Sequence, residues 1–221
     1  MRTSALKSLA NAGTVADVWQ VKNDDERIEL IRNAVFESLT DPLAIWVARK
    51  IVADCPSRNE DCELRALYKA IKHGPIPIPT DKGIINAVGL RFIVPGAGEK
   101  GLRFIEDSRN IDQYPAAGRI LRWLAEGANG EDCDGHSILI DTLALIMGFQ
   151  TGAIIASRDG TNYVHVFPAI GIPKGQPTRW LPMDTTVPEA YPGWMPPSNY
   201  GVRAMKAYAI KPGRVKGRKI L

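Results

Sequence analysis

The sequence is poor in cysteine, with Cys55, Cys62 and Cys133 as the three among 221 residues. Three cysteines cannot all pair within one chain, so we expect a reducing compartment and one reactive thiol. Cys55 and Cys62 flank a short link between two expected helices, which leaves a disulfide, half of a metal site and two buried thiols open. We favour the two thiols, and we expect no zinc here because no second Cys/His pair stands nearby at zinc-ligand spacing.

Long apolar runs and basic runs are also missing. No stretch approaches about 18 consecutive apolar residues, so we expect no transmembrane helix and no membrane partner. Arg2 and Lys7 precede no apolar segment, so we expect no secretory signal and a cytoplasmic location in the producing cell. The net charge of +4 is slight and no basic run alternates with aromatics, so a nucleic-acid partner is expected only through the basic tail.

What is present fits a globular protein of ordinary size. Hydrophobic residues make up 45% and charged residues 24% of the chain, which are typical proportions for a folded domain with a substantial core. We divide the chain into an N-terminal arm and helix at 1–40, a cysteine domain at 41–210 and a basic tail at 211–221.

Apolar spacing and cap residues predict the elements of this domain. Helices are expected at about 24–39, 42–53, 59–71, 116–125 and 133–147. Strands are expected at 153–156, 163–167, 179–186 and 202–210, with a hairpin formed by 88–94 and 102–106, a stiff extended link at 74–79 and a proline-rich, aromatic wrap at 185–200.

The helix at 133–147 carries Cys133 at its start. Asn129, Gly130 and Asp132 supply turn and cap chemistry before it, Leu139 and Leu143 lie on the inward face, and Gly148 is the expected left-handed residue after the end. The free N–H groups and the positive end of the dipole favour a thiolate at such a position. A thiolate attacks carbonyl carbon, so Cys133 is a candidate nucleophile.

Two residues downstream complete a candidate triad. His165 stands on an expected strand and Asp184 at the end of the next, which supplies a base and an orienting carboxylate for Cys133. The alternative is a metal bound by these three residues and His136, but a triad explains them with fewer coincidences. We expect His136 to hydrogen-bond a neighbouring loop or position the helix, Asp134 to serve the cap, and Asp141 to lie on a solvated face.

These segments resemble the transglutaminase-like superfamily, in particular a branch common in bacteria and bacteriophages. The resemblance covers about residues 42–190 and rests on four runs: CPSRNEDCELRA at 55–66, DCDGH at 132–136, VHV at 164–166 and WLPMDTT at 180–186. The chain departs from the pattern at Glu131, where glycine is usual. It also has Asp134 where crosslinking transglutaminases carry tryptophan, which argues against crosslinking.

The resemblance implies a papain-like α+β fold, with N-terminal helices packed on an antiparallel sheet and Cys133, His165 and Asp184 as catalytic residues. It implies no cofactor and no metal. We therefore expect a thiol enzyme of acyl transfer, a cysteine peptidase, amidase or related hydrolase acting on a protein or peptide. The alternative is a phage virion or assembly protein that keeps the fold as a binding module for phage structural proteins, and is incorporated in the particle.

Overall fold

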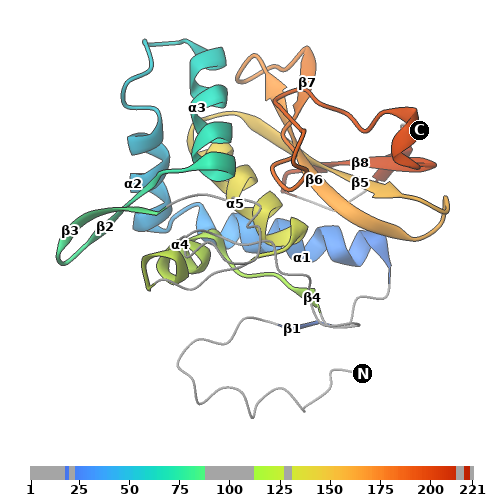
Figure 1. The fold of residues 1–221 in the computed structure, drawn as a ribbon, viewed down its shortest axis with the longest axis horizontal. Coiled ribbons are helices and arrows are strands. Elements are labelled where there is room, and N and C mark those ends of the chain that lie inside the picture. The colour runs from blue at the N-terminus through green and yellow to red at the C-terminus, as the bar shows by residue number, and fades with distance from the viewer. Residues whose placement is uncertain (1–17, 20–22, 88–111, 127–130, 213–216, 220–221) are drawn as a thin grey trace.

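A computed structural model describes residues 18–19, 23–87, 112–126, 131–212 and 217–219. These residues combine helices with antiparallel sheets, so the α+β prediction is confirmed (Figure 1). Several predicted features lie outside the described residues: the arm at 1–17 and 20–22, the hairpin of 88–94 and 102–106, the glycine-rich run at 127–130, and residues 213–216 and 220–221 of the basic tail.

The helices begin at residues whose side chains satisfy free backbone N–H groups. Asn23, Asp41 and Asn59 each accept an N–H from the first turn of the helix that follows. Proline at the first position of α2 needs no such partner, because it has no N–H. The helices are α1 (Asp24–Ser38), α2 (Pro42–Ile51), α3 (Glu60–His73), α4 (Ala117–Glu126) and α5 (Cys133–Ile146).

The largest sheet has five antiparallel strands in the order β7-β6-β5-β8-β9. They are β5 (Gln150–Ser157), β6 (Tyr163–Ile172), β7 (Arg179–Pro182), β8 (Ala204–Ile210) and β9 (Gly217–Lys219). The predicted strand at 179–186 is shorter than expected, so Asp184 lies in the loop after β7. Three residues of the predicted tail form β9 and pair with β8.

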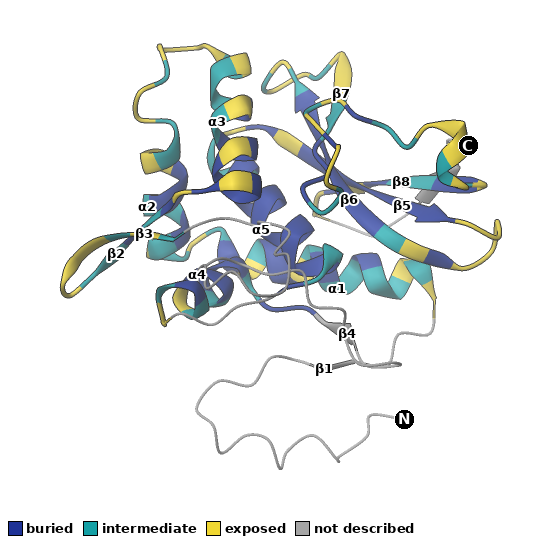
Figure 2. Cartoon of the chain, viewed as in Figure 1, coloured by how far each residue is buried: buried dark blue, intermediate teal, exposed yellow. Residues whose placement is uncertain are grey.

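Helix α5 is the centre of the packing. It contacts the other four helices on one side and strands β5 and β6 on the other (Figure 1). Every residue from Asp134 to Ala144 is buried, and the helix is drawn almost entirely in dark blue in Figure 2. Burial therefore extends around the whole helix, which is typical of a helix enclosed by other elements.

The opposite face of the sheet has a smaller core of its own. Ile154, Phe167 and Met205 are buried there, and Met195 and Val202 pack against them. Met195 and the short 3-10 helix at Ser198–Tyr200 belong to the predicted proline-rich wrap, whereas Val202, predicted as the first residue of the last strand, lies before β8. The wrap thus covers the sheet face that points away from α5.

Two small two-stranded antiparallel sheets complete the description. Strand β1 (Val18–Trp19) pairs with β4 (Asp112–Gln113), and β2 (Ile76–Thr80) pairs with β3 (Gly83–Ala87). The segment predicted as a stiff link is therefore partly a strand. Among the described residues, no helix has both the length and the apolar character that a membrane crossing requires.

The prediction of two buried thiols at Cys55 and Cys62 is wrong. A disulfide joins them, with their Cα atoms 5.7 Å apart across the link between α2 and α3. The tight turn at Arg58, which has a positive φ of 63°, lies inside this loop. The bond leaves Cys133 as the free cysteine and removes the cysteine-based argument for a reducing compartment.

Candidate active site

Cys133 is the first residue of α5, and the predicted cap before it is confirmed. One side-chain oxygen of Asp132 accepts the N–H groups of Asp134 and Gly135, at 2.8 and 3.2 Å. The Ser137 hydroxyl donates to the Cys133 carbonyl oxygen at 2.8 Å. The N–H groups predicted to stabilise a thiolate are therefore already occupied by a carboxylate.

Gly135 is required by close packing at this turn. A Cβ at that position would lie 2.2 Å from a carboxylate oxygen of Glu131 and 2.9 Å from its Cβ. Glu131 is buried, so it has little room to move away. The glycine thus lets the chain before the helix pass close to the turn that carries Cys133.

The prediction of a stabilised thiolate is not supported. Burial raises the pKa of the Cys133 thiol well above its usual value, and the carboxylates of Asp134 and Asp132 raise it further. A hydrogen bond with the Val166 backbone and the charge of Arg27 act in the opposite direction without overcoming these effects. Cys133 is therefore a thiol at neutral pH and needs a base to become a nucleophile.

His165 and Asp184 form the ion-pair geometry that the sequence predicts. Nε2 of His165 lies 2.7 Å from Oδ2 of Asp184, whose side chain is fully buried. The other carboxylate oxygen accepts the backbone N–H and the hydroxyl of Thr186, at 2.9 and 2.8 Å. Burial alone would raise the pKa of Asp184, but the bonds from His165 and Thr186 outweigh it and lower this pKa below 3.8.

The loop that carries Asp184 is anchored to helix α3. The Tyr68 hydroxyl lies 2.8 Å from the Asp184 carbonyl oxygen and 2.6 Å from that of Ala190. The Lys72 ammonium donates to Tyr68 at 3.0 Å, to the Val187 carbonyl at 2.8 Å and to the Ala190 carbonyl. A buried lysine thus replaces its lost hydration with carbonyl oxygens and fixes the backbone next to Asp184.

His136 holds the same loop from the side of α5, as expected. Its Nδ1 lies 2.9 Å from the Thr185 hydroxyl, and its Nε2 has no hydrogen-bond partner among the described residues. Burial lowers the pKa of His136 to about 3. The imidazole is therefore neutral at physiological pH and serves as a fixed polar contact.

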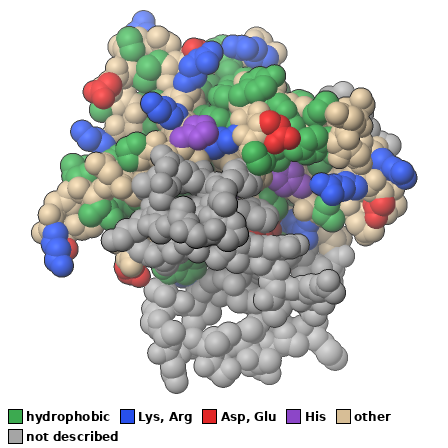
Figure 3. Space-filling model, viewed as in Figure 1, with side chains coloured by type: hydrophobic (Ala, Val, Ile, Leu, Met, Phe, Trp, Pro, Cys, Tyr) green, Lys and Arg blue, Asp and Glu red, His purple; other side chains and the backbone are tan. Residues whose placement is uncertain are grey.

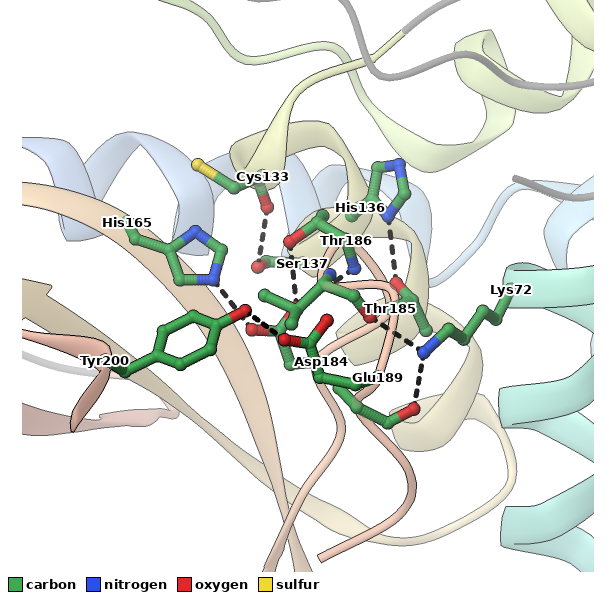
Figure 4. A network of polar contacts seen from close by, with 12 residues as sticks. Lys72, Cys133, His136, Ser137, His165, Asp184, Thr185, Thr186, Glu189 and Tyr200 are labelled. Atoms are coloured by element: carbon green, nitrogen blue, oxygen red, sulfur yellow. Dashed lines mark hydrogen bonds and ion pairs between the residues drawn. The ribbon is translucent and has the colours of Figure 1, made fainter. Parts of the chain in front are cut away.

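The three predicted triad residues come from α5, β6 and the loop after β7. Figure 4 shows Nε2 of His165 directed at Asp184 and the other ring nitrogen turned toward the side where the Cys133 sulfur is drawn. The thiol itself bonds the backbone of Val166, the residue after His165. The fold therefore places a thiol, an imidazole and a buried carboxylate in one region.

The prediction that Asp141 lies on a solvated face is wrong. Asp141 is 0% exposed, and burial raises the pKa of its carboxyl well above 3.8. The Thr151 hydroxyl is close enough to offset part of this rise, yet neither Asp141 oxygen makes a contact of normal hydrogen-bond geometry with a described residue. The helix is enclosed on all sides, so it has no solvated face at this position.

A cavity of about 280 Å³ opens beside His165. Its polar lining residues are Arg158, His165, Thr186 and Tyr200, and the rest of the wall is apolar. Sequence reasoning missed this cavity because its walls come from separate segments. It also missed Tyr68 and Lys72 as anchors of the Asp184 loop. A signal was present, because Lys72 lies one helical turn after Tyr68, which faces inward, and could therefore have been expected on the inward side of the helix.

No group of three or more His, Cys, Asp and Glu residues with metal-binding geometry occurs in the described part of the chain. On the face drawn in Figure 3, hydrophobic and charged side chains alternate, and the coloured residues form no large patch of one sign.

Comparison with known proteins adds no assignment: no protein-family model matches the chain, and no curated protein matches it.

Proposed function

We propose that the chain is a thiol enzyme of acyl transfer with a papain-like, transglutaminase-like fold, and that it hydrolyses an amide or peptide bond. The observation that carries the proposal is the 2.7 Å contact between His165 and a fully buried Asp184 carboxylate, next to the strand backbone that contacts Cys133. A buried aspartate with a depressed pKa stabilises an imidazolium, which a general base must become.

The first step joins the sulfur to the substrate. The Cys133 sulfur attacks the carbonyl carbon while its proton moves to Nδ1 of His165, and Asp184 stabilises the imidazolium. The Cys133 backbone N–H is the simplest donor to the oxyanion. The imidazolium then protonates the leaving nitrogen, the C–N bond breaks, and a thioester remains on Cys133.

The second step regenerates the enzyme. His165 removes a proton from water, the resulting oxygen nucleophile attacks the thioester carbonyl, and the proton returns to the sulfur as the C–S bond breaks. The anchoring of Asp184 by Tyr68 and Lys72 supports this role, because a base is effective when its orienting partner is held in place.

An acylation experiment tests the proposal. Active esters of N-acetylated amino acids should add one acyl group per chain, located at Cys133 by peptide mass mapping. Cys133→Ser should not form the thioester, and His136→Asn, which keeps a hydrogen-bonding atom near Thr185, should acylate normally. A folded wild-type protein that forms no adduct with any ester would contradict the enzyme proposal.

The second candidate is a binding module, the alternative in which a phage virion or assembly protein retains the fold without catalysis. The raised pKa of the Cys133 thiol favours it, because a protonated thiol is a poor nucleophile unless its base is well placed. The same acylation, repeated on His165→Ala, separates the candidates, since a module has no reason to acylate at one cysteine in a His165-dependent way.

A further inference from the structure

The cavity beside His165 has the size and composition of a subsite for one residue. Its volume of about 280 Å³ lies just below the roughly 300–1,000 Å³ of typical small-molecule sites. Val164, Val187, Trp194, Pro196 and Val202 form its apolar walls. Trp194 is 8% exposed, and its ring meets Tyr200 edge-on at 5.3 Å, so this wall is fixed by packing.

Arg158 gives the cavity a positive group at its lining. It is exposed and makes no hydrogen bond or ion pair with a described residue. The nearby carboxylates are engaged elsewhere: Asp159 accepts bonds from Ser157, Thr161 and Asn162 within its own turn. Glu189 accepts the Tyr200 hydroxyl at 2.6 Å. The guanidinium is therefore the available partner for an anion at this cavity.

The position of His165 decides which half of a substrate the cavity receives. In the proposed mechanism the imidazolium gives its proton to the leaving nitrogen, so we assign the cavity that His165 lines to the part of the substrate that leaves as an amine. A leaving residue that fills this cavity brings an apolar side chain to Trp194 and Val187. If it is the last residue of a peptide, its α-carboxylate is the anion nearest to that side chain.

We propose that the cavity binds an apolar amino-acid residue with a free α-carboxylate, held by Arg158, as the leaving part of the substrate. The assignment of this residue as the leaving part rests on the proposed function. The binding of an apolar carboxylate in the cavity does not depend on it. The enzyme then releases a C-terminal apolar residue: the C–N bond breaks, His165 protonates the nitrogen, and the acyl part stays on Cys133 until water removes it.

A binding experiment with a catalytically silent protein tests the site. N-acetyl-leucine and its neutral analogue N-acetyl-leucinamide are titrated into the Cys133→Ser variant, with tryptophan fluorescence and calorimetry as readouts. We expect the carboxylate to bind about tenfold more tightly than the amide, as a charge-assisted contact predicts. N-acetyl-aspartate, which lacks the apolar side chain, should bind more weakly than N-acetyl-leucine.

Variants assign the effect to Arg158. Arg158→Met should remove the preference for the carboxylate and leave amide binding unchanged, and Arg158→Lys should retain part of it. Arg49→Met, at an exposed arginine of α2, is the matched control and should change nothing. Equal affinity for acid and amide, or an unchanged preference in Arg158→Met, would overturn the proposal even if Cys133 acylates normally.

An activity experiment keeps the two proposals apart. Where the wild type is active, it should release leucine from N-acetyl-Ala-Leu faster than leucinamide from N-acetyl-Ala-Leu-amide. Equal release of both overturns the subsite while the enzyme proposal stands. Absence of acylation overturns the enzyme proposal, while selective carboxylate binding in Cys133→Ser would still establish the site.

Discussion

Two buried polar side chains of helix α5, His136 and Asp141, lie five positions apart and differ in their hydrogen bonds and in the direction of their pKa shifts. His136 is 1% exposed, bonds Thr185 and has its pKa lowered to about 3. Asp141 is 0% exposed, has no hydrogen bond of normal geometry with a described residue and has its pKa raised. A rotation of roughly 140° about the helix axis separates them, so one faces the Asp184 loop and the other the strand side at Thr151.

The comparison shows that burial alone does not mark a functional group. In both side chains the loss of water disfavours the charged form, as the direction of each pKa shift indicates. Only His136 belongs to a set of contacts that ends at the candidate base, through Thr185 and Asp184. The region near Cys133 is thus organised by hydrogen bonds, whereas the region near Asp141 carries an uncompensated polar group.

The two groups also predict opposite effects of pH on stability. The pKa of His136 is lower in the folded than in the unfolded chain, so stability is full above about 6.5 and falls as pH decreases toward 3. The pKa of Asp141 is higher in the folded chain, so stability is full below about 3.8 and falls as pH increases through the folded value.

The largest effect is expected from removing the candidate general base, His165, from the hydrogen-bonded region near Cys133, which we call the organised region. His165→Ala should reduce turnover by a factor of about 10³–10⁶, because the members of a catalytic unit fail together. It should also slow alkylation of Cys133 by iodoacetamide, since the thiol loses the acceptor of its proton. Asp184→Asn should slow alkylation less, and a Cys133→Ser/His165→Ala double variant should lose little more activity than either single variant.

Rates are measured on substrate and by intact-mass alkylation, with circular dichroism to verify the fold. Unchanged alkylation of a folded His165→Ala protein would mean that the imidazole does not serve the thiol. The organised region would then be a structural network, equivalent in role to the surroundings of Asp141.

The next largest effect is the acid sensitivity of His136. The pKa of this histidine is 6.5 in the unfolded chain and about 3 in the folded one. This difference corresponds to a loss of about 4 kcal/mol in the free energy of unfolding between pH 7 and pH 3. His136→Asn keeps a side-chain atom close to the position of Nδ1 and does not titrate, so its stability should fall less in acid. Urea unfolding at pH 7, 5 and 3 measures this, and parallel curves for both proteins would rule out a buried neutral imidazole.

The sequence predicted much of the organised region and little of its support. The cap at Asp132, the left-handed Gly148, with its φ of 91°, and the bond of His136 to a neighbouring loop follow from local patterns that need no tertiary information. The chain order of Cys133, His165 and Asp184 was also readable. Local rules reach as far as one turn or one hairpin.

The errors have a common physical cause, which is that burial depends on distant segments. The thiolate prediction for Cys133 ignored that the Asp132 carboxylate takes the N–H groups and adds a negative charge. The solvated position of Asp141 assumed an amphipathic helix, although α5 is enclosed by four helices and two strands. Lys72 owes its role to a loop more than 100 residues away in the chain. Arg158 owes its role to a cavity assembled from separate segments.

A smaller effect is expected from loosening the support of the organised region. Lys72→Met retains the length of the side chain but leaves the carbonyl oxygens of Val187 and Ala190 without this donor, at a cost of about 1–3 kcal/mol in the free energy of unfolding. Because these carbonyls belong to the Asp184 loop, Cys133 alkylation should slow as well. Lys69→Met, at an exposed neighbour on α3, is the control; loss of stability without any change in alkylation would separate the anchor from the site.

The smallest effect, and the one of opposite sign, is expected at Asp141. Asp141→Asn removes the ionisation that burial opposes, so it should raise the free energy of unfolding by about 0.5–2 kcal/mol at pH 7. At pH 3 the wild-type carboxyl is protonated in both states, and the two proteins should be equally stable. Alkylation of Cys133 should not change, because no contact of the carboxyl reaches the Asp184 loop. Thermal unfolding across this pH range measures the gain; a variant that is less stable at pH 7, or that alters Cys133 reactivity, would show that Asp141 has a partner and belongs with His136.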